Sequence, residues 1–131
     1  MRILVCEDQD AIRCMIETLV AASGHAVAGV ATGSKAVERA LAESFDVLLL
    51  DLMLPGSLDG FDVCQRLRAD DRTRDLPIFV ISAMDDPESR ARAMTAGATA
   101  FYGKPFSPVA LLKDIDGLAK KTKRRSKRPK S

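Results

Sequence analysis

Carboxylates, a hydroxyl and an ammonium group stand at the ends of short apolar runs in this sequence. The residues are Glu7 and Asp8 after the first run, Asp51 after the third, Ser82 at the end of the fourth and Lys104 after the fifth. Asp is a poor strand former and is seldom buried without a partner, so an aspartate behind Val47–Leu50 needs an explanation. Three carboxylates held together repel one another unless a divalent cation lies between them. Oxygen ligands without His or Cys favour Mg²⁺, Mn²⁺ or Ca²⁺ over zinc.

The remaining polar groups are suited to an anion. The Ser82 hydroxyl, the backbone N–H of the small residue Ala83 and the Lys104 ammonium group would together bind a tetrahedral dianion such as a phosphoryl group. Asp51 would then be the nucleophile that receives this group.

These side chains meet only if the apolar runs are strands of one sheet. Strands are predicted at 2–6, 26–31, 46–50, 77–82 and 99–103. Segments of helical periodicity alternate with them, at about 9–24, 34–44, 60–69, 86–97 and 107–120. The expected N-caps include Ser34, Asp86 and Ser107, and a proline follows each of the last two.

Five strands that alternate with five helices predict an α/β protein whose parallel sheet is covered on both faces. Right-handed crossovers leave few topologies, and we expect a doubly wound, flavodoxin-like (βα)5 sheet in the order 2-1-3-4-5. Ligands bind such sheets at the carboxyl ends of the strands, where the winding direction changes. Here that point lies between strands 1 and 3, so Glu7, Asp8 and Asp51 should converge.

The motifs around these residues resemble the receiver domains of two-component response regulators. The matching pieces, in order along residues 1–119, are ILVCED, DVLLLDLMLPG with DGFDVC, IFVISA and AGATAFYGKPF. One such motif alone is a weak signal, whereas all four at the ends of strands 1, 3, 4 and 5 are specific. The resemblance implies a regulatory phosphoacceptor that assists only its own phosphorylation and dephosphorylation, and not an enzyme in the ordinary sense.

The resemblance also implies how the acidic residues act. Asp51 would accept a phosphoryl group from a sensor histidine kinase or a phosphotransfer protein. Glu7, Asp8, Asp51 and the backbone carbonyl of Met53 would hold Mg²⁺, with Mn²⁺ as a substitute. Catalysis at such a site is mainly positioning and charge neutralisation.

For the phosphorylated state, the resemblance implies that Ser82, Ala83 and Lys104 bind the phosphoryl oxygens. Ser82 would move toward the phosphoryl group while Tyr102 turns inward, and this would change a protein-interaction surface on strand 5 and its flanking helices. The sequence does not identify the downstream protein. A cis peptide bond is expected between Lys104 and Pro105.

The loop after Asp51 departs from the family's usual pattern. One residue usually separates Pro-Gly from Asp-Gly, whereas Ser57 and Leu58 both lie between Pro55-Gly56 and Asp59-Gly60 here. Because the extra residue follows Met53, the metal site should be kept. We expect the loop to bulge outward, where a kinase would dock.

Two other functions remain open at this point. DQDAI, residues 8–12, resembles the start of haloacid-dehalogenase-type phosphohydrolases, in which Asp8 would be the nucleophile and Asp10 the general acid. Alternatively, the fold could be a phosphate-independent scaffold.

Composition separates an acidic body from a basic end. Residues 120–131 hold 8 of the 20 basic residues and no acid, so residues 1–119 carry 12 basic and 18 acidic groups, a net charge of −6. We predict a receiver domain at 1–119 and a disordered basic tail at 120–131, which could bind polyanions weakly. No helix-turn-helix segment is evident, so a folded DNA-binding domain is not expected, and we expect the regulator to stand alone.

Nothing in the sequence predicts a membrane span or a signal peptide, because no apolar run approaches about 18 residues. The three cysteines form no CxxC pair, which fits free thiols and argues against a zinc site. We therefore expect a cytoplasmic protein.

Overall fold

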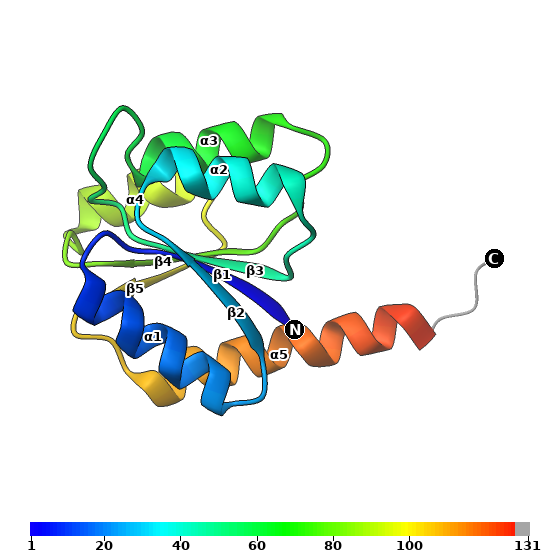
Figure 1. The fold of residues 1–131 in the computed structure, drawn as a ribbon. Coiled ribbons are helices and arrows are strands. Elements are labelled where there is room, and N and C mark those ends of the chain that lie inside the picture. Colours follow the sequence, from blue (N-terminus) through cyan, green and yellow to red (C-terminus); the bar gives the residue numbers. More distant parts are fainter. Residues whose placement is uncertain (128–131) are drawn as a thin grey trace.

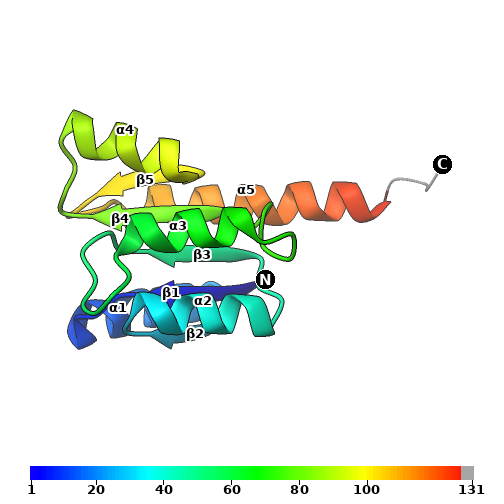
Figure 2. The same cartoon turned by 90° about the horizontal axis from the view of Figure 1, so that it is seen from above.

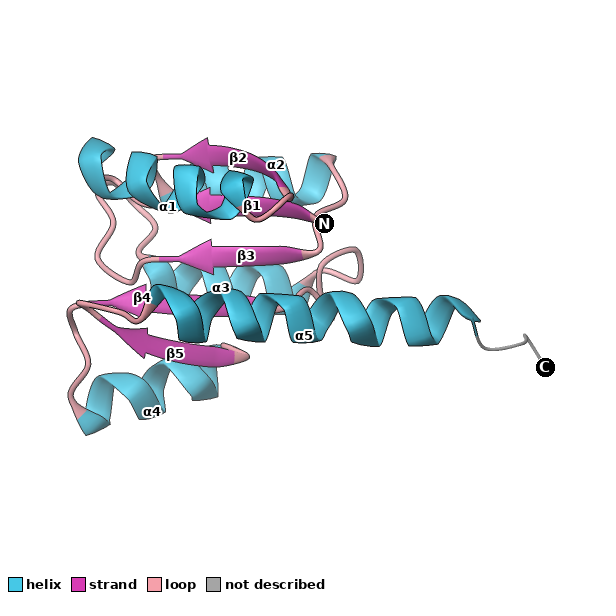
Figure 3. Cartoon of the chain, turned by 90° about the horizontal axis from the view of Figure 1, so that it is seen from below, coloured by secondary structure: helices cyan, strands magenta, loops and turns pink. Residues whose placement is uncertain are grey.

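Five strands form one parallel sheet in the order β2-β1-β3-β4-β5, as predicted. The structure is a computed structural model; it describes residues 1–127, with side chains up to residue 118. The strands are β1 (Arg2–Cys6), β2 (Ala26–Val30), β3 (Val47–Leu50), β4 (Ile78–Ser82) and β5 (Ala100–Gly103). All their carboxyl ends lie at one edge of the sheet, on the left in Figure 3.

Helices cover both faces of this sheet. Figure 1 shows three helices on one face, α2 (Gly33–Ala42), α3 (Gly60–Ala69) and α4 (Pro87–Ala96). The other face carries α1 (Asp10–Ala22) and α5 (Pro108–Lys127). This is the doubly wound arrangement that the alternation of strands and helices predicted.

Successive residues of a strand pack into different cores. On β3, Leu48 and Leu50 belong to the core beneath α2, α3 and α4, whereas Val47 and Leu49 belong to the core beneath α1 and α5. All four side chains are essentially buried. A strand whose two faces are both covered must be apolar at every position, which explains the uninterrupted run before Asp51.

Two of the three predicted N-caps are confirmed. The Asp86 side chain caps α4 by accepting from the Ser89 backbone N–H, and the Ser107 hydroxyl accepts from the Ala110 N–H at the start of α5. Thr32, and not Ser34, caps α2, because its hydroxyl accepts from the Lys35 backbone N–H at 3.2 Å. Both residue types are good caps, so the sequence alone did not decide between neighbouring candidates.

The last helix is longer than the sequence predicted. It continues as helix to Lys127, and Figure 2 shows it extending past the amino-terminal edge of the sheet. Lys and Arg are good helix formers and the first proline after Pro108 is Pro129, so nothing in 120–127 interrupts the helix. Residues 128–131 lie outside the described residues, and a separate tail at 120–131 stays a prediction. No helix within the described part of the chain has the length and apolar character needed to cross a bilayer.

Candidate functional site

Strand pairing brings the three predicted carboxylates together. Cys6 of β1 lies opposite Leu50 of β3, so the residues that follow these two strands emerge side by side. The Asp51 backbone N–H donates to the Cys6 carbonyl at 3.0 Å, which extends the pairing by one residue. Glu7, Asp8 and Asp51 each offer a carboxylate oxygen, and these oxygens lie within 4.8 Å of one another.

Lys104 reaches this carboxylate cluster from the far edge of the sheet. Ser82 of β4 lies opposite Gly103 of β5, and the Lys104 backbone N–H donates to the Ser82 carbonyl at 3.0 Å. The Lys104 Nζ then donates to Glu7 Oε1 at 2.6 Å and to Asp51 Oδ2 at 3.1 Å. One ammonium group thus bridges two of the three carboxylates. The Lys104–Pro105 peptide bond is cis, as expected.

The cluster is partly withdrawn from water. Glu7 is 2% exposed and Asp51 is 7% exposed, whereas Asp8 is exposed. Burial raises the pKa of Glu7, against the lowering effect of the hydrogen bond from Lys104. Burial acts to lower the pKa of Lys104, but hydrogen bonds to Glu7 and Asp51 outweigh it and the pKa is raised. The lysine is therefore firmly protonated beside the carboxylates.

Several backbone contacts hold Glu7 and Asp51 in place, and sequence reasoning did not find them. The Gln9 N–H donates to Glu7 Oε2 at 3.1 Å, and Arg13 donates to the Glu7 carbonyl at 2.8 Å. The Met53 N–H donates to Asp51 Oδ1 at 3.2 Å. The two Asp51 carboxylate oxygens therefore face different donors, a backbone N–H and Lys104.

Gly60 allows α3 to begin directly against Asp51. A Cβ atom at Gly60 would lie 2.4 Å from the Asp51 carbonyl oxygen and 2.5 Å from the Leu52 Cα, so no other residue fits without displacing backbone. The preceding residue, Asp59, caps α3 through a reciprocal capping box with Asp62. The Asp-Gly dipeptide was a visible signal for this contact, but its steric reason depends on the fold.

Ser82 and Tyr102 are each engaged elsewhere in this structure. Ser82 is fully buried, and its hydroxyl accepts from the Met84 N–H at 3.1 Å. The Tyr102 hydroxyl donates to Asp114 of α5, and its ring packs at a tilt against Phe79, with 5.7 Å between centroids. Burial and the Asp114 carboxylate raise the pKa of Tyr102. Ser82 would have to give up its hydrogen bond in order to move toward Asp51, and Tyr102 would have to give up its own in order to turn inward.

The loop between β3 and α3 stands out from the body only in part. Pro55, Gly56 and Ser57 are exposed, and Figure 1 shows the loop arching beyond the strand ends. Leu58, by contrast, is half-buried and packs against the core beneath α2, α3 and α4. It lies so close to Gly33 that a Cβ atom there would be 2.6 Å from the Leu58 carbonyl. The loop thus bulges as expected but is anchored again just before α3.

The carboxylate cluster opens into a hollow of about 730 Å³ at the carboxyl end of the sheet, which we call the carboxyl-end hollow. Its lining includes Asp8, Asp51, Ala83 and Lys104 from four different strand ends. An all-carboxylate set fits a hard divalent cation. The nearby Cys6 thiol does not compete as a ligand, because burial and then Asp51 raise its pKa to about 12.

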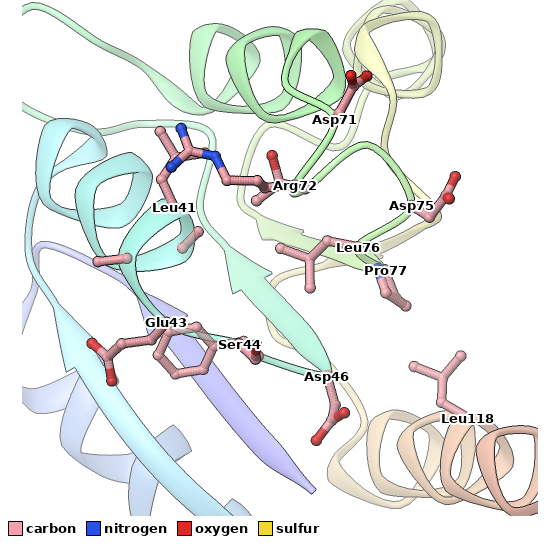
Figure 4. A pocket seen from close by; sticks show the side chains of 14 residues that line it. Leu41, Glu43, Ser44, Asp46, Asp71, Arg72, Asp75, Leu76, Pro77 and Leu118 are labelled. Carbon is pink, nitrogen blue, oxygen red and sulfur yellow. The ribbon is translucent and has the colours of Figure 1, made fainter. Parts of the chain in front are cut away.

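A second hollow of about 740 Å³ lies at the opposite, amino-terminal edge of the sheet, and we call it the amino-end hollow (Figure 4). Its acidic lining side chains are Glu43, Asp46, Asp71 and Asp75. Glu43 pairs with Arg2 at 2.7 Å, and Asp71 pairs with Arg74 at 3.1 Å. Glu43 and Asp71 are thus neutralised in separate ion pairs.

A haloacid-dehalogenase-type mechanism would need Asp10 as a general acid beside Asp8. Asp10 is the first residue of α1, is exposed, and pairs with Arg13 at 2.6 Å. It is not part of the carboxylate cluster, which takes its third member from β3 instead.

The carboxylate cluster and Lys104 lie at the switch point of a five-stranded doubly wound sheet. This arrangement is typical of regulators that bind phosphoryl groups, and comparison with known proteins agrees. The family model of the response regulator receiver domain matches residues 3–116. The chain therefore belongs to the receiver domains of two-component response regulators. This match does not favour the hydrolase alternative.

Individual relatives support the same assignment. The chain is 34% identical over 123 residues to the DNA-binding dual master transcriptional regulator RpaA of Synechocystis, covering 94% of this chain and 51% of that protein. It resembles the receiver domain of the Francisella response regulator 1452 with a TM-score of 0.85 and 27% identity, covering 92% and 98% of the two chains.

A third relative was solved with a metal. The receiver domain of sensor histidine kinase PA1611 from Pseudomonas aeruginosa has a TM-score of 0.83 and 30% identity, with 89% and 95% of the two chains covered. In that structure a magnesium ion is coordinated in the active-site cleft. This chain thus matches whole receiver domains but spans about half of its longer curated relative.

Proposed function

We propose that Asp51 is the phosphoacceptor of this receiver domain and takes its phosphoryl group from a phosphohistidine of a sensor kinase or phosphotransfer protein. The bond that forms joins an Asp51 carboxylate oxygen to phosphorus, and the bond that breaks joins phosphorus to the imidazole nitrogen, which leaves with the bonding electrons. The observation that carries the proposal is a buried Asp51 carboxylate within 3.1 Å of Lys104 and beside Glu7 and Asp8.

The residues of the chain divide the work of this transfer. Glu7, Asp8, Asp51 and the backbone carbonyl of Met53 would hold Mg²⁺, or Mn²⁺ in its place. When bound, the ion supplies charge neutralisation between the acidic groups and the incoming phosphoryl oxygens. Lys104 is already within hydrogen-bonding distance of Asp51 and would pair with one of these oxygens.

Two further groups would take the other phosphoryl oxygens. Ala83 lines the carboxyl-end hollow and would offer its backbone N–H, and the neighbouring Ser82, which is buried, would offer its hydroxyl. Binding by Ser82 requires that its hydroxyl leave the Met84 N–H. A donor set of this kind favours a tetrahedral dianion over a flat carboxylate.

The resulting switch would run from Ser82 to Tyr102. Movement of Ser82 makes room on β4, and Tyr102 on the neighbouring β5 would exchange its hydrogen bond with Asp114 for an inward position. This changes the contact between β5 and α5, and so the surface that a downstream protein would read. We infer that the chain acts as a regulator in this way and not as an enzyme on a separate substrate.

The wider setting remains part of the proposal. RpaA is a DNA-binding transcriptional regulator by its description. A weak attraction of the basic segment for polyanions and a location in the cytoplasm both stay predictions.

The test is incorporation of phosphate from labelled acetyl phosphate in the presence of Mg²⁺. Asp51→Asn should abolish incorporation, because the acceptor oxygen is lost, while Asp10→Asn should retain it, because Asp10 lies outside the cluster. Normal labelling of the Asp51→Asn protein would show that another residue is the acceptor. Label found on Asp8 instead of Asp51 would revive the hydrolase scheme.

A further inference from the structure

Arg92 is a second cation at the carboxyl-end hollow, and the receiver motifs do not account for it. It lies on α4 and lines the same hollow as Asp51 and Lys104. Its guanidinium carbon is 3.9 Å from the centroid of the Phe61 ring on α3, which also lines the hollow. Among the described residues this ring contact is the interaction that holds Arg92, since it forms no ion pair there.

Counting charges shows why a second cation is useful. Glu7, Asp8 and Asp51 bring three negative charges, which a divalent cation and Lys104 would balance. Phosphorylation replaces the single charge of the Asp51 carboxylate by the nearly two charges of a phosphoryl group. About one negative charge is then left without a partner in a site that is partly withdrawn from water.

We propose that Arg92 is a further phosphate-binding residue, which leaves the Phe61 ring and pairs with the phosphoryl group on Asp51. The inference rests on the proposed function of Asp51. Stacking on a ring leaves the guanidinium N–H donors without an acceptor, whereas a guanidinium paired with a phosphate forms strong, often bidentate hydrogen bonds. Arg92 therefore stacks on the Phe61 ring beside the hollow in which the phosphoryl group would form.

The position of Arg92 on α4 gives this pairing a consequence beyond affinity. Ser82 and Lys104 follow strands that are fixed in the sheet, whereas Arg92 belongs to a helix that packs beside α3 and β5. A bond from Arg92 to the phosphoryl group would tie α4 directly to the state of Asp51. It would also uncover the Phe61 ring, which is only 4% exposed with the arginine over it.

The same helix provides a matched control. Arg90 also stacks on an aromatic ring, with its guanidinium carbon 4.7 Å from the Phe101 centroid, but it does not line the carboxyl-end hollow. Arg90→Gln removes an equal charge and a stacking contact from α4, together with a hydrogen bond from the Arg90 Nε to the Asp85 carbonyl. A difference between the two variants therefore reports the hollow and not the general charge of the helix.

The experiment is a calorimetric titration of the full chain with beryllofluoride, a phosphoryl mimic, at saturating Mg²⁺. Arg92→Gln should raise the beryllofluoride Kd about tenfold, as expected for one lost charge-assisted contact, while Arg90→Gln should change it less than about twofold. Arg92→Lys, which keeps the charge without the planar fork, should recover part of the loss. The Kd for Mg²⁺ alone should not weaken in any of these variants.

Each outcome bears on a different statement. Unchanged beryllofluoride binding by Arg92→Gln, or equal losses in the Arg90 and Arg92 variants, would overturn the role of Arg92. A loss of Mg²⁺ binding in Arg92→Gln would also overturn it, because the residue would then support the structure of the site. If the unaltered chain did not bind beryllofluoride, or Asp51→Asn bound it as well as the unaltered chain, the proposed function itself would fail and take this inference with it.

Discussion

The two hollows at opposite edges of the sheet have almost the same volume and very different chemistry. The carboxyl-end hollow measures about 730 Å³ and the amino-end hollow about 740 Å³. In the first, Glu7, Asp8 and Asp51 converge within 4.8 Å and share one lysine. In the second, Glu43 pairs with Arg2 and Arg39, and Asp71 pairs separately with Arg74.

The arrangement of charges, and not the size of a hollow, distinguishes the functional end of this molecule. Mutual repulsion between carboxylates favours the binding of a cation, whereas a carboxylate in a surface ion pair already has a partner of opposite charge. The parallel sheet produces this contrast, because residues that follow several strands meet at one edge.

The largest expected difference between the two ends is in metal affinity. Asp8→Asn at the carboxyl-end hollow should weaken Mg²⁺ binding on the order of 100-fold, because the ion loses a negatively charged ligand. Asp75→Asn at the amino-end hollow should change the Kd by less than about twofold. Titration calorimetry of both variants measures the contrast, and equal effects would mean that the two acidic ends do not differ as described.

A smaller difference is expected in stability when a cation is removed from each end. Lys104→Met should lower the free energy of unfolding by about 2 kcal/mol without metal, because Glu7 and Asp51 lose their shared partner. The loss is limited because the raised pKa of Glu7 helps that side chain to take up a proton.

The matched change at the other end is Arg74→Met. Its partner Asp71 is exposed, so the unfolding free energy should fall by at most about 0.5 kcal/mol. Urea titrations at pH 7 in a chelator compare the two variants. Added Mg²⁺ should narrow the stability gap between Lys104→Met and the unaltered chain and leave the gap of Arg74→Met unchanged, and the reverse pattern would contradict the charge argument.

The smallest effects concern two glycines, and they should have opposite signs. Gly60→Ala should destabilise the fold by about 1–2 kcal/mol, because its Cβ would press on the backbone of Asp51 and Leu52. Gly117→Ala, in α5 next to the amino-end hollow, meets no atom within 4 Å and should stabilise by about 0.5–1 kcal/mol. Thermal unfolding decides the signs, and a destabilised Gly117→Ala would show that α5 is strained there.

The general fold was predictable from the sequence because short apolar runs alternate with segments of helical periodicity. Once the strand order was inferred, the meeting of Glu7, Asp8 and Asp51 followed from chain topology alone. Lys104 could be placed at the same edge for the same reason. These predictions depend on backbone geometry, which the sequence pattern encodes directly.

Contacts that depend on side-chain reach were not predictable. Met15 fits the apolar period of α1, yet it is 51% exposed. The choice of Thr32 over Ser34 as a cap, the support of the Glu7 carbonyl by Arg13 and the stacking of Arg92 on Phe61 all require the packed structure. A period of 3.6 residues does not say how wide the covered face of a helix is.

The hydrogen bond between Tyr102 and Asp114 has a mechanical consequence, because α5 is one continuous helix from Pro108 to Lys127. At 1.5 Å per residue, the backbone at Lys127 lies about 20 Å along the axis from Asp114. A tilt of about 5° at Asp114 would therefore move the distal end of this rod by nearly 2 Å, by the same geometry. A rearrangement of Tyr102 at the carboxyl-end edge of the sheet would therefore displace the part of α5 that extends past the opposite edge.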